Sequence, residues 1–172
     1  QTGAVVPSQR FLISKMISPI PPTYSGPILE LGAGTGALTR RLAARCPKAH
    51  ILACEINPVL AKDLEYCLTA SGCNRNVKVV SDSAQHILEG MRKNRSKRVD
   101  FVLSGIPLGN LDREQVLELI GAISNALNPG GLYIQFQYSL VDRRNIQSRF
   151  NKLRTAPAFL NFPPAFVYYA RK

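Results

Sequence analysis

Long apolar runs, histidines and paired cysteines are all scarce in this 172-residue chain. It has no run of 18 or more apolar residues, which excludes a membrane-spanning helix on length. The first residues, QTGAVVPSQR, lack the basic and then apolar segments of a signal peptide. With two histidines and four cysteines that form no CxxC pair, no zinc pattern can be assembled, and we expect no metal site. Unpaired cysteines are typical of a reduced compartment, which predicts a cytoplasmic protein.

Acidic residues are also scarce, with 11 Asp and Glu against 22 Lys and Arg, for a net charge of +11. Such an excess attracts polyanions, either nucleic acid or an anionic membrane surface, although it also serves solubility alone. Charge by itself leaves these alternatives open. The apolar fraction of 45% is ordinary for a folded protein, and the length predicts one domain spanning residues 1–172.

Short apolar segments alternate with amphipathic ones along most of the chain. The apolar segments predict strands at 28–31, 51–55, 77–81, 99–104, 132–138 and 166–170. The amphipathic segments predict helices at 36–45, 58–71 and 113–127, with Pro58 in a first turn and Asp112 as an N-cap. This alternation predicts a parallel sheet covered on both faces.

The last third of the chain departs from that alternation. A basic segment at 141–152 (VDRRNIQSRFNK) has a helical pattern. Residues 153–172 then form two extended pieces around Pro163 and Pro164, with no room for a helix between them. We therefore expect a closing hairpin with an antiparallel last strand. Another basic segment at 91–98 (MRKNRSKR) is either a solvated loop or a phosphate-contacting patch.

The first 26 residues stand outside the core predicted at 27–172. Residues 8–18 (SQRFLISKMIS) form an amphipathic pattern with the basic residues Arg10 and Lys15 and an apolar face of Phe11, Leu12, Ile13, Met16 and Ile17. A proline-rich linker, SPIPPTYSGP, follows and cannot be helical.

A glycine loop, ELGAGTG, follows the first predicted strand of the core. Its glycines, Gly32, Gly34 and Gly36, permit positive φ and let a ligand approach the backbone, and the next helix directs free N–H groups at that ligand. Dinucleotide enzymes use a related loop, so the glycines alone leave the ligand open. Glu30 narrows the choice of ligand, because a carboxylate there would repel a pyrophosphate and suits a positively charged amino-acid end.

Two further acids follow the next two predicted strands. Glu55, followed by Ile56, is placed to accept hydrogen bonds from both hydroxyls of a ribose. Asp82 is placed to accept from an exocyclic amine, and Ser83 or Ala84 offers a main-chain N–H to the ring. An ammonium end, a ribose and an adenine together describe S-adenosylmethionine.

With these motifs the chain resembles the class I S-adenosylmethionine-dependent methyltransferases. The resemblance implies a Rossmann-like α/β fold, with a seven-stranded, mostly parallel sheet whose last strand is antiparallel. It implies S-adenosylmethionine as methyl donor and S-adenosylhomocysteine as product. The cofactor-binding residues expected on this basis are Glu30, Gly32, Gly34, Thr35, Gly36, Glu55, Ile56, Asp82, Ser83 and Ser104.

The methyl acceptor is indicated by residues 104–108 (SGIPL), at the end of the fourth predicted strand. Methyltransferases of this class that act on base nitrogens carry Asn or Asp and then an aromatic residue there; this chain has Ser104 and Leu108. Without a stacking ring, a flipped base is a poor acceptor. SGIPL, GAVVPS, NPGGLYIQFQYS and FPPAFVYYARK together resemble the bacterial phospholipid N-methyltransferases, which are related to rRNA adenine dimethyltransferases.

This second resemblance implies methylation of phosphatidylethanolamine and its methylated intermediates towards phosphatidylcholine. The enzyme would be a monomer that meets an anionic membrane peripherally. Ser104 and the carbonyl of Gly105 would hold the amine, and Tyr138 would contact the methyl group or the methylammonium unless it is a half-buried core aromatic. We interpret His86 as structural rather than as a base.

Basic residues complete the expected acceptor site. Arg143 and Arg144 would hold the lipid phosphate, or form a solvated helix face. The helix at 8–18 would lie in the membrane interface with Arg10 and Lys15 near head groups. A second role, covering the active site or packing on the sheet, is compatible with the first. The alternative functions are an rRNA or other nucleic-acid adenine N6-methyltransferase and a non-catalytic protein that retains the cofactor fold.

Overall fold

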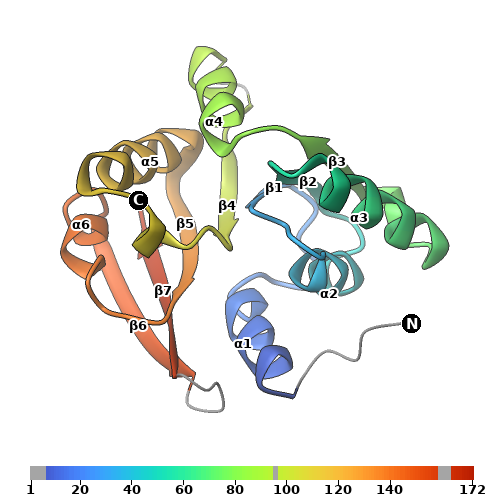
Figure 1. Cartoon of the computed structure of the whole chain (residues 1–172), viewed down its shortest axis with the longest axis horizontal. Coiled ribbons are helices and arrows are strands. Elements are labelled where there is room, and N and C mark those ends of the chain that lie inside the picture. Colours follow the sequence, from blue (N-terminus) through green and yellow to red (C-terminus); the bar gives the residue numbers. More distant parts are fainter. Residues whose placement is uncertain (1–6, 95–96, 159–163) are drawn as a thin grey trace.

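A mixed seven-stranded sheet forms the centre of the protein (Figure 1). The structure, a computed structural model, describes residues 7–94, 97–158 and 164–172. The strands lie in the order β3-β2-β1-β4-β5-β7-β6. Their bounds are β1 Pro27–Leu31, β2 His50–Glu55, β3 Val77–Ser81, β4 Val99–Ser104, β5 Leu127–Gln137, β6 Lys152–Ala158 and β7 Ala165–Arg171. β1 to β5 run parallel, and β7 pairs antiparallel with both β5 and β6. The predicted α/β fold with an antiparallel last strand is therefore confirmed.

The strand predictions differ from the structure mainly after residue 126. β5 begins at Leu127, where it pairs with Val99, and the register shifts before it pairs with Phe101. It ends at Gln137, so Tyr138 lies just outside the sheet. The helical prediction for 141–152 was wrong over most of its length, because the short helix α6 (Arg143–Gln147) gives way to β6 at Lys152. The turn expected before Pro164 lies outside the described residues, as do two residues of the 91–98 segment.

Helices cover both faces of the sheet (Figure 1). Beside α6, they are α1 Pro7–Ile17, α2 Ala37–Arg45, α3 Pro58–Ala70, α4 Ala84–Lys93 and α5 Arg113–Ala126, with short 3-10 turns at Asn74–Asn76 and Leu108–Asn110. The side chains of Asn57, Ser83 and Asp112 accept main-chain hydrogen bonds in the first turns of α3, α4 and α5. The predicted N-cap at Asp112 is confirmed, with a full capping box.

The core is divided by the sheet. The side chains of α4, α5 and α6 pack on one face, around Leu88, Ile120 and Ile146. Those of α1 and α2 pack on the other face, around Met16 and Leu42. The carboxyl ends of the central parallel strands therefore lie between two helical layers, where a ligand site is expected.

The N-terminal helix α1 packs against the protein with its apolar face. Leu12, Ile13, Met16 and Ile17 are all buried in the cluster that contains the sheet residues Ile134 and Val167. This is the second of the two roles expected for the helix, and it leaves that face unavailable to lipid in the folded state.

Lys15 is also tied to the protein rather than directed outward with Arg10. Its ammonium group donates a 2.7 Å hydrogen bond to the carbonyl of Pro157, and Tyr169 donates a 2.7 Å hydrogen bond to the Lys15 carbonyl. The expectation that Lys15 lies near lipid head groups is therefore not supported, whereas Arg10 is exposed.

Candidate active site

The glycine loop between β1 and α2 has the backbone that only glycine adopts readily. Gly32, Gly34 and Gly36 have φ values of 74°, 55° and 75°. A side chain at Gly34 would meet no atom within 4 Å, so this part of the loop is open to a ligand. A side chain at Gly36 would instead collide with the buried Leu64 of α3. The two glycines therefore serve different needs, ligand approach at one and helix packing at the other.

Glu30, at the end of β1, is a buried carboxylate without a partner in the described part of the chain. The residue is 1% exposed, and neither carboxylate oxygen accepts a hydrogen bond. Burial raises the pKa of Glu30 to about 8, and the nearby hydroxyl of Thr39 opposes that shift. An unpaired buried carboxylate is costly, so its place beside a ligand loop indicates a cationic or hydrogen-bond-donating ligand.

Glu55, at the end of β2, is fixed directly beside the glycine loop. One of its oxygens accepts a 2.7 Å hydrogen bond from the N–H of Gly34, and the other accepts a 2.9 Å hydrogen bond from the N–H of Asn57. Each carboxylate oxygen has a further lone pair, so Glu55 keeps the capacity to accept from two hydroxyls. The neighbouring Ile56 is exposed, with its apolar side chain free to meet a ligand ring.

Asp82, after β3, is oriented by its own helix terminus. One oxygen accepts a 2.7 Å hydrogen bond from the N–H of Ser83, and the other lies 2.7 Å from Nδ1 of His86. The main-chain N–H of Asp82 donates to the carbonyl of Glu55, which links the two acidic positions. His86 is thus a partner of Asp82, a contact that sequence reasoning missed although the i, i+4 spacing at a helix start could have revealed it.

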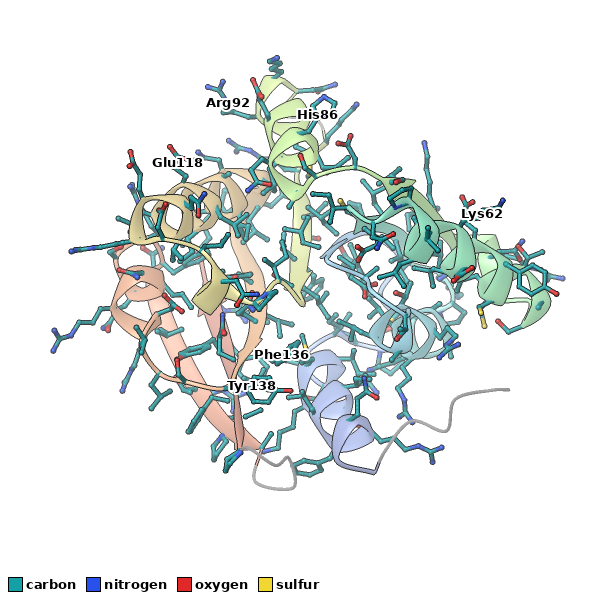
Figure 2. The ribbon with its side chains drawn as sticks, viewed as in Figure 1. Lys62, His86, Arg92, Glu118, Phe136 and Tyr138 are labelled. Carbon is teal, nitrogen blue, oxygen red and sulfur yellow. The ribbon has the colours of Figure 1, made fainter. Side chains whose placement is uncertain are left out.

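A pocket of about 430 Å³ lies between this loop and α1. Glu30 and residues of the glycine loop line it, together with the apolar side chains of Leu12 and Met16 of α1 and the rings of Phe136 and Tyr138. Figure 2 shows Phe136 and Tyr138 beside α1. A larger groove of about 1090 Å³ runs between α4 and α5, but none of the predicted site residues lines it.

Residues 104–108 pack tightly against the glycine loop, but Ser104 does not take the expected position. Gly105 lines the pocket, its N–H donates to the carbonyl of Leu31, and a Cβ there would lie 2.8 Å from the Gly32 carbonyl oxygen. Ser104 is fully buried and its hydroxyl accepts from the N–H of Ile106. The structure therefore does not bring the Ser104 hydroxyl to the pocket, and its expected role in holding the cofactor and the amine is not supported.

A buried hydrogen-bond network holds the main chain of residues 104–108, and sequence reasoning missed this network. Gln135 accepts a 2.7 Å hydrogen bond from the hydroxyl of Tyr133 and donates a 2.9 Å hydrogen bond to the carbonyl of Ile106. Gln135 is a polar residue in an otherwise apolar segment that was predicted to be a buried strand, and this signal could have indicated a buried hydrogen-bond network. Leu108 is 1% exposed and packs in the core.

Tyr138 and the arginines of α6 lie in different surroundings. Tyr138 is 55% exposed, packs edge-on against Phe136, and lines the pocket, so it is a residue of the pocket mouth and not of the core. Arg143 and Arg144 are exposed and do not line the pocket. Their α6 packs on the α5 side of the sheet through Ile146. The structure therefore does not bring these arginines to the predicted amine site.

Strand order, glycine loop and acidic strand ends together define a class I S-adenosylmethionine-dependent methyltransferase. A family model described as a methyltransferase domain matches residues 28–131, more than half of the chain, and the chain belongs to that family. A protein described as ornithine lipid N-methyltransferase, from Singulisphaera acidiphila, is 27% identical over 98% of this chain and 88% of its own length.

Solved structures share the fold at low identity. A precorrin-6y C5,15-methyltransferase from Geobacter metallireducens is 16% identical with a TM-score of 0.76, covering all of this chain and 94% of that one. A 16S rRNA N2 G1207 methyltransferase from T. thermophilus, solved with AdoMet and guanosine, is 21% identical with a TM-score of 0.71. That match covers all of this chain but only 44% of the rRNA enzyme.

S-adenosylmethionine is the cofactor of this protein, and the site residues fit it. It supplies a methyl group bound to a sulfonium sulfur. The carboxylate of Glu30, which has no hydrogen-bond partner, suits the ammonium group of the cofactor, and Glu55 suits its ribose. The open space beside Gly34 lets the cofactor approach the protein main chain. Among the described residues, no group of His, Cys, Asp and Glu could hold a metal ion, and no helix is long and apolar enough to cross a membrane.

Proposed function

We propose that this protein N-methylates the head-group amine of a membrane lipid, with phosphatidylethanolamine and its methylated intermediates as acceptors. It works as a peripheral enzyme at the cytoplasmic side of an anionic membrane. The observation that carries the proposal is the similarity to an ornithine lipid N-methyltransferase along nearly the whole of both chains. By contrast, the match to the 16S rRNA methyltransferase shows the fold alone and covers less than half of that enzyme's length.

The pocket supports an acceptor that brings an amine on an apolar body. Beside Glu30, the pocket lining includes Leu12, Met16 and Phe136, which suit acyl or glycerol carbons rather than phosphates. At the string where base-methylating enzymes carry a stacking ring, this chain has Leu108, and that side chain is enclosed in the core. Base recognition by stacking therefore has no support at that position.

The chemistry required of the protein is mainly positioning. The acceptor amine attacks in line and must be neutral, and the chain contributes by orienting it and excluding water. Among the described residues that line the pocket, the titratable ones are Glu30 and Tyr138. Glu30 is assigned to the cofactor. The ring of Tyr138 at the pocket mouth suits the growing methylammonium, which an aromatic face attracts.

A single assay with four acceptors tests the proposal. The protein is incubated with radiolabelled S-adenosylmethionine and vesicles of phosphatidylethanolamine, vesicles of ornithine lipid, undermethylated rRNA, or no acceptor. We expect label in the extracted phosphatidylethanolamine, and less label with the Glu55→Ala variant at a limiting cofactor concentration. Label in ornithine lipid alone would show that ornithine lipid, and not phosphatidylethanolamine, is the acceptor. Label in RNA alone would show that the protein is a nucleic-acid methyltransferase. Cofactor binding without any transfer would indicate the non-catalytic alternative.

A further inference from the structure

The loop that follows β5 presents an unusual run of exposed apolar side chains. Tyr138 is 55% exposed, Leu140 44% and Val141 80%, so three of four consecutive residues are large, apolar and in contact with water. Single exposed apolar residues are common, but a contiguous group at one place marks an interaction surface. We call residues 138–141 the β5–α6 loop.

Hydrogen bonds to its main-chain carbonyls hold the β5–α6 loop in place. Tyr168 of β7 donates a 3.1 Å hydrogen bond from its hydroxyl to the carbonyl of Ser139, and the N–H of Arg143 donates to the carbonyl of Leu140. Asp142, directly after the loop, is buried at 7% exposure. The loop is thus fixed at both ends while the side chain of Val141 is exposed to solvent. Folding alone does not require an apolar side chain at such a position.

Positive charge lies directly beside these apolar side chains. Arg143 and Arg144 begin α6, both are exposed, and neither takes part in an ion pair within the described part of the chain. Apolar side chains next to unpaired arginines match an anionic bilayer, whose phosphates and acyl carbons lie at adjacent depths. A nucleic acid would use the arginines but would leave Leu140 and Val141 in water, so the combination favours lipid.

The loop also lies where a lipid would enter the site. Tyr138 belongs both to the loop and to the lining of the pocket, and Figure 2 shows it beside α1. The apolar face of α1 is packed on the sheet and cannot serve as the docking surface. We propose that the β5–α6 loop, with Arg143 and Arg144, docks the enzyme on an anionic bilayer and sets the pocket mouth against it. This inference rests on the proposed function, whose lipid acceptor it brings to the pocket.

Vesicle cosedimentation of the full chain tests the docking surface. The vesicles contain phosphatidylethanolamine with or without phosphatidylglycerol as the anionic lipid. We expect Leu140→Asp with Val141→Asp to weaken binding at least tenfold, because two inserted apolar groups become repelled charges. Val59→Asp on α3, at a residue 65% exposed and outside the loop, is the matched control and should bind like the native protein. Equal binding of the double variant and the native protein would overturn the proposal.

The arginines give a second reading in the same experiment. Arg143→Gln with Arg144→Gln should lose about fivefold in affinity per charge for the anionic vesicles, and should flatten the salt dependence. Unchanged salt dependence would contradict their part in docking. If the double aspartate variant lost binding to rRNA and not to vesicles, the surface would belong to RNA, and the lipid proposal would be wrong.

Activity measurements separate this inference from the proposed function. With a short-chain phosphatidylethanolamine below its micelle concentration, the double aspartate variant should methylate as the native protein does, and only its activity on vesicles should fall. A native protein that binds vesicles through this loop but methylates no lipid would disprove the function and leave the docking surface standing. Equal loss on both forms of lipid would show that the loop acts on the site itself and would overturn docking as its role.

Discussion

The carboxylate of Glu55 accepts a 2.7 Å hydrogen bond from the main-chain N–H of Gly34. The end of β2 and the glycine loop after β1 are therefore joined through a residue that we expect to bind the cofactor. Glu55 has two tasks, since it holds the loop at its most open point and retains acceptor capacity for a ribose. Any change of this side chain should affect both the cofactor and the loop.

Glu55→Ala should weaken S-adenosylmethionine binding. Hydrogen bonds to a charged group contribute about 1.5–3 kcal/mol each, so the loss of two should lower the affinity by at least tenfold. Isothermal titration calorimetry measures the change. Glu65→Ala removes an exposed carboxylate from α3 and is the charge-matched control. An affinity for Glu55→Ala equal to that of the control would rule out the ribose role.

Glu30 should make stability depend on pH in an unusual direction. Burial raises its pKa to about 8, from an ordinary 4.5. Between these values the unfolded chain loses the proton while the folded protein keeps it, so stability is highest below pH 4.5 for this group and falls as pH rises towards 8. The loss is on the order of 4 kcal/mol. Urea unfolding at pH 5 and pH 8 should show it in the native protein and not in Glu30→Gln.

The same carboxyl group should release a proton when the cofactor binds. An ammonium group placed beside Glu30 favours the ionised form, so at pH 7 complex formation should release about one proton. Calorimetric titrations in buffers of different ionisation enthalpy measure that number. Glu30→Gln should show weaker binding and a smaller release. A native protein whose binding heat is independent of the buffer would contradict a cationic partner for Glu30.

Gly34 and Gly36 should respond differently to the same substitution. Both have left-handed backbones, which cost alanine about 1–2 kcal/mol. Gly36→Ala also forces a methyl group against the packed Leu64 and should lower the free energy of unfolding by roughly 3 kcal/mol or more. Gly34→Ala should cost stability less but cofactor affinity more, because its methyl group enters the open side of the loop. Thermal unfolding with and without S-adenosylmethionine compares them, and the reverse ranking would contradict these assignments.

Most strands and the acidic residues at their ends could be predicted because their signals are local. The apolar segments, their spacing and the residues that follow them are all readable along the chain, and parallel pairing then brings Glu30, Glu55 and the glycine loop together. The Asp112 capping box was equally local. Such features depend on neighbours within a few residues, so the sequence contains them in full.

Features that depend on which face a side chain takes were harder to predict. Ser104 is the last residue of β4 and comes directly after the buried Val102 and Leu103, so strict alternation gives no sign that its hydroxyl is buried as well. Only the start of β6 was misplaced: Lys152 was assigned to the basic helical pattern before it, whereas the rest of β6 falls in the first of the two expected extended pieces. The partner of Asp82 was missed because His86 was read from its apolar neighbour Ile87 rather than from the residue four positions earlier.

The role of α1 could not be decided from its sequence, because an amphipathic helix has the same pattern whether it meets lipid or protein. The structure makes the distinction testable. Met16, at 2% exposure, is enclosed by the sheet, so Met16→Ala should cost about 2–5 kcal/mol of unfolding free energy. Phe11, at 37% exposure, is the control on the same helix, and Phe11→Ala should cost less. Urea unfolding without vesicles measures both, and equal small losses would mean that α1 does not pack on the sheet in solution and is free to enter a membrane.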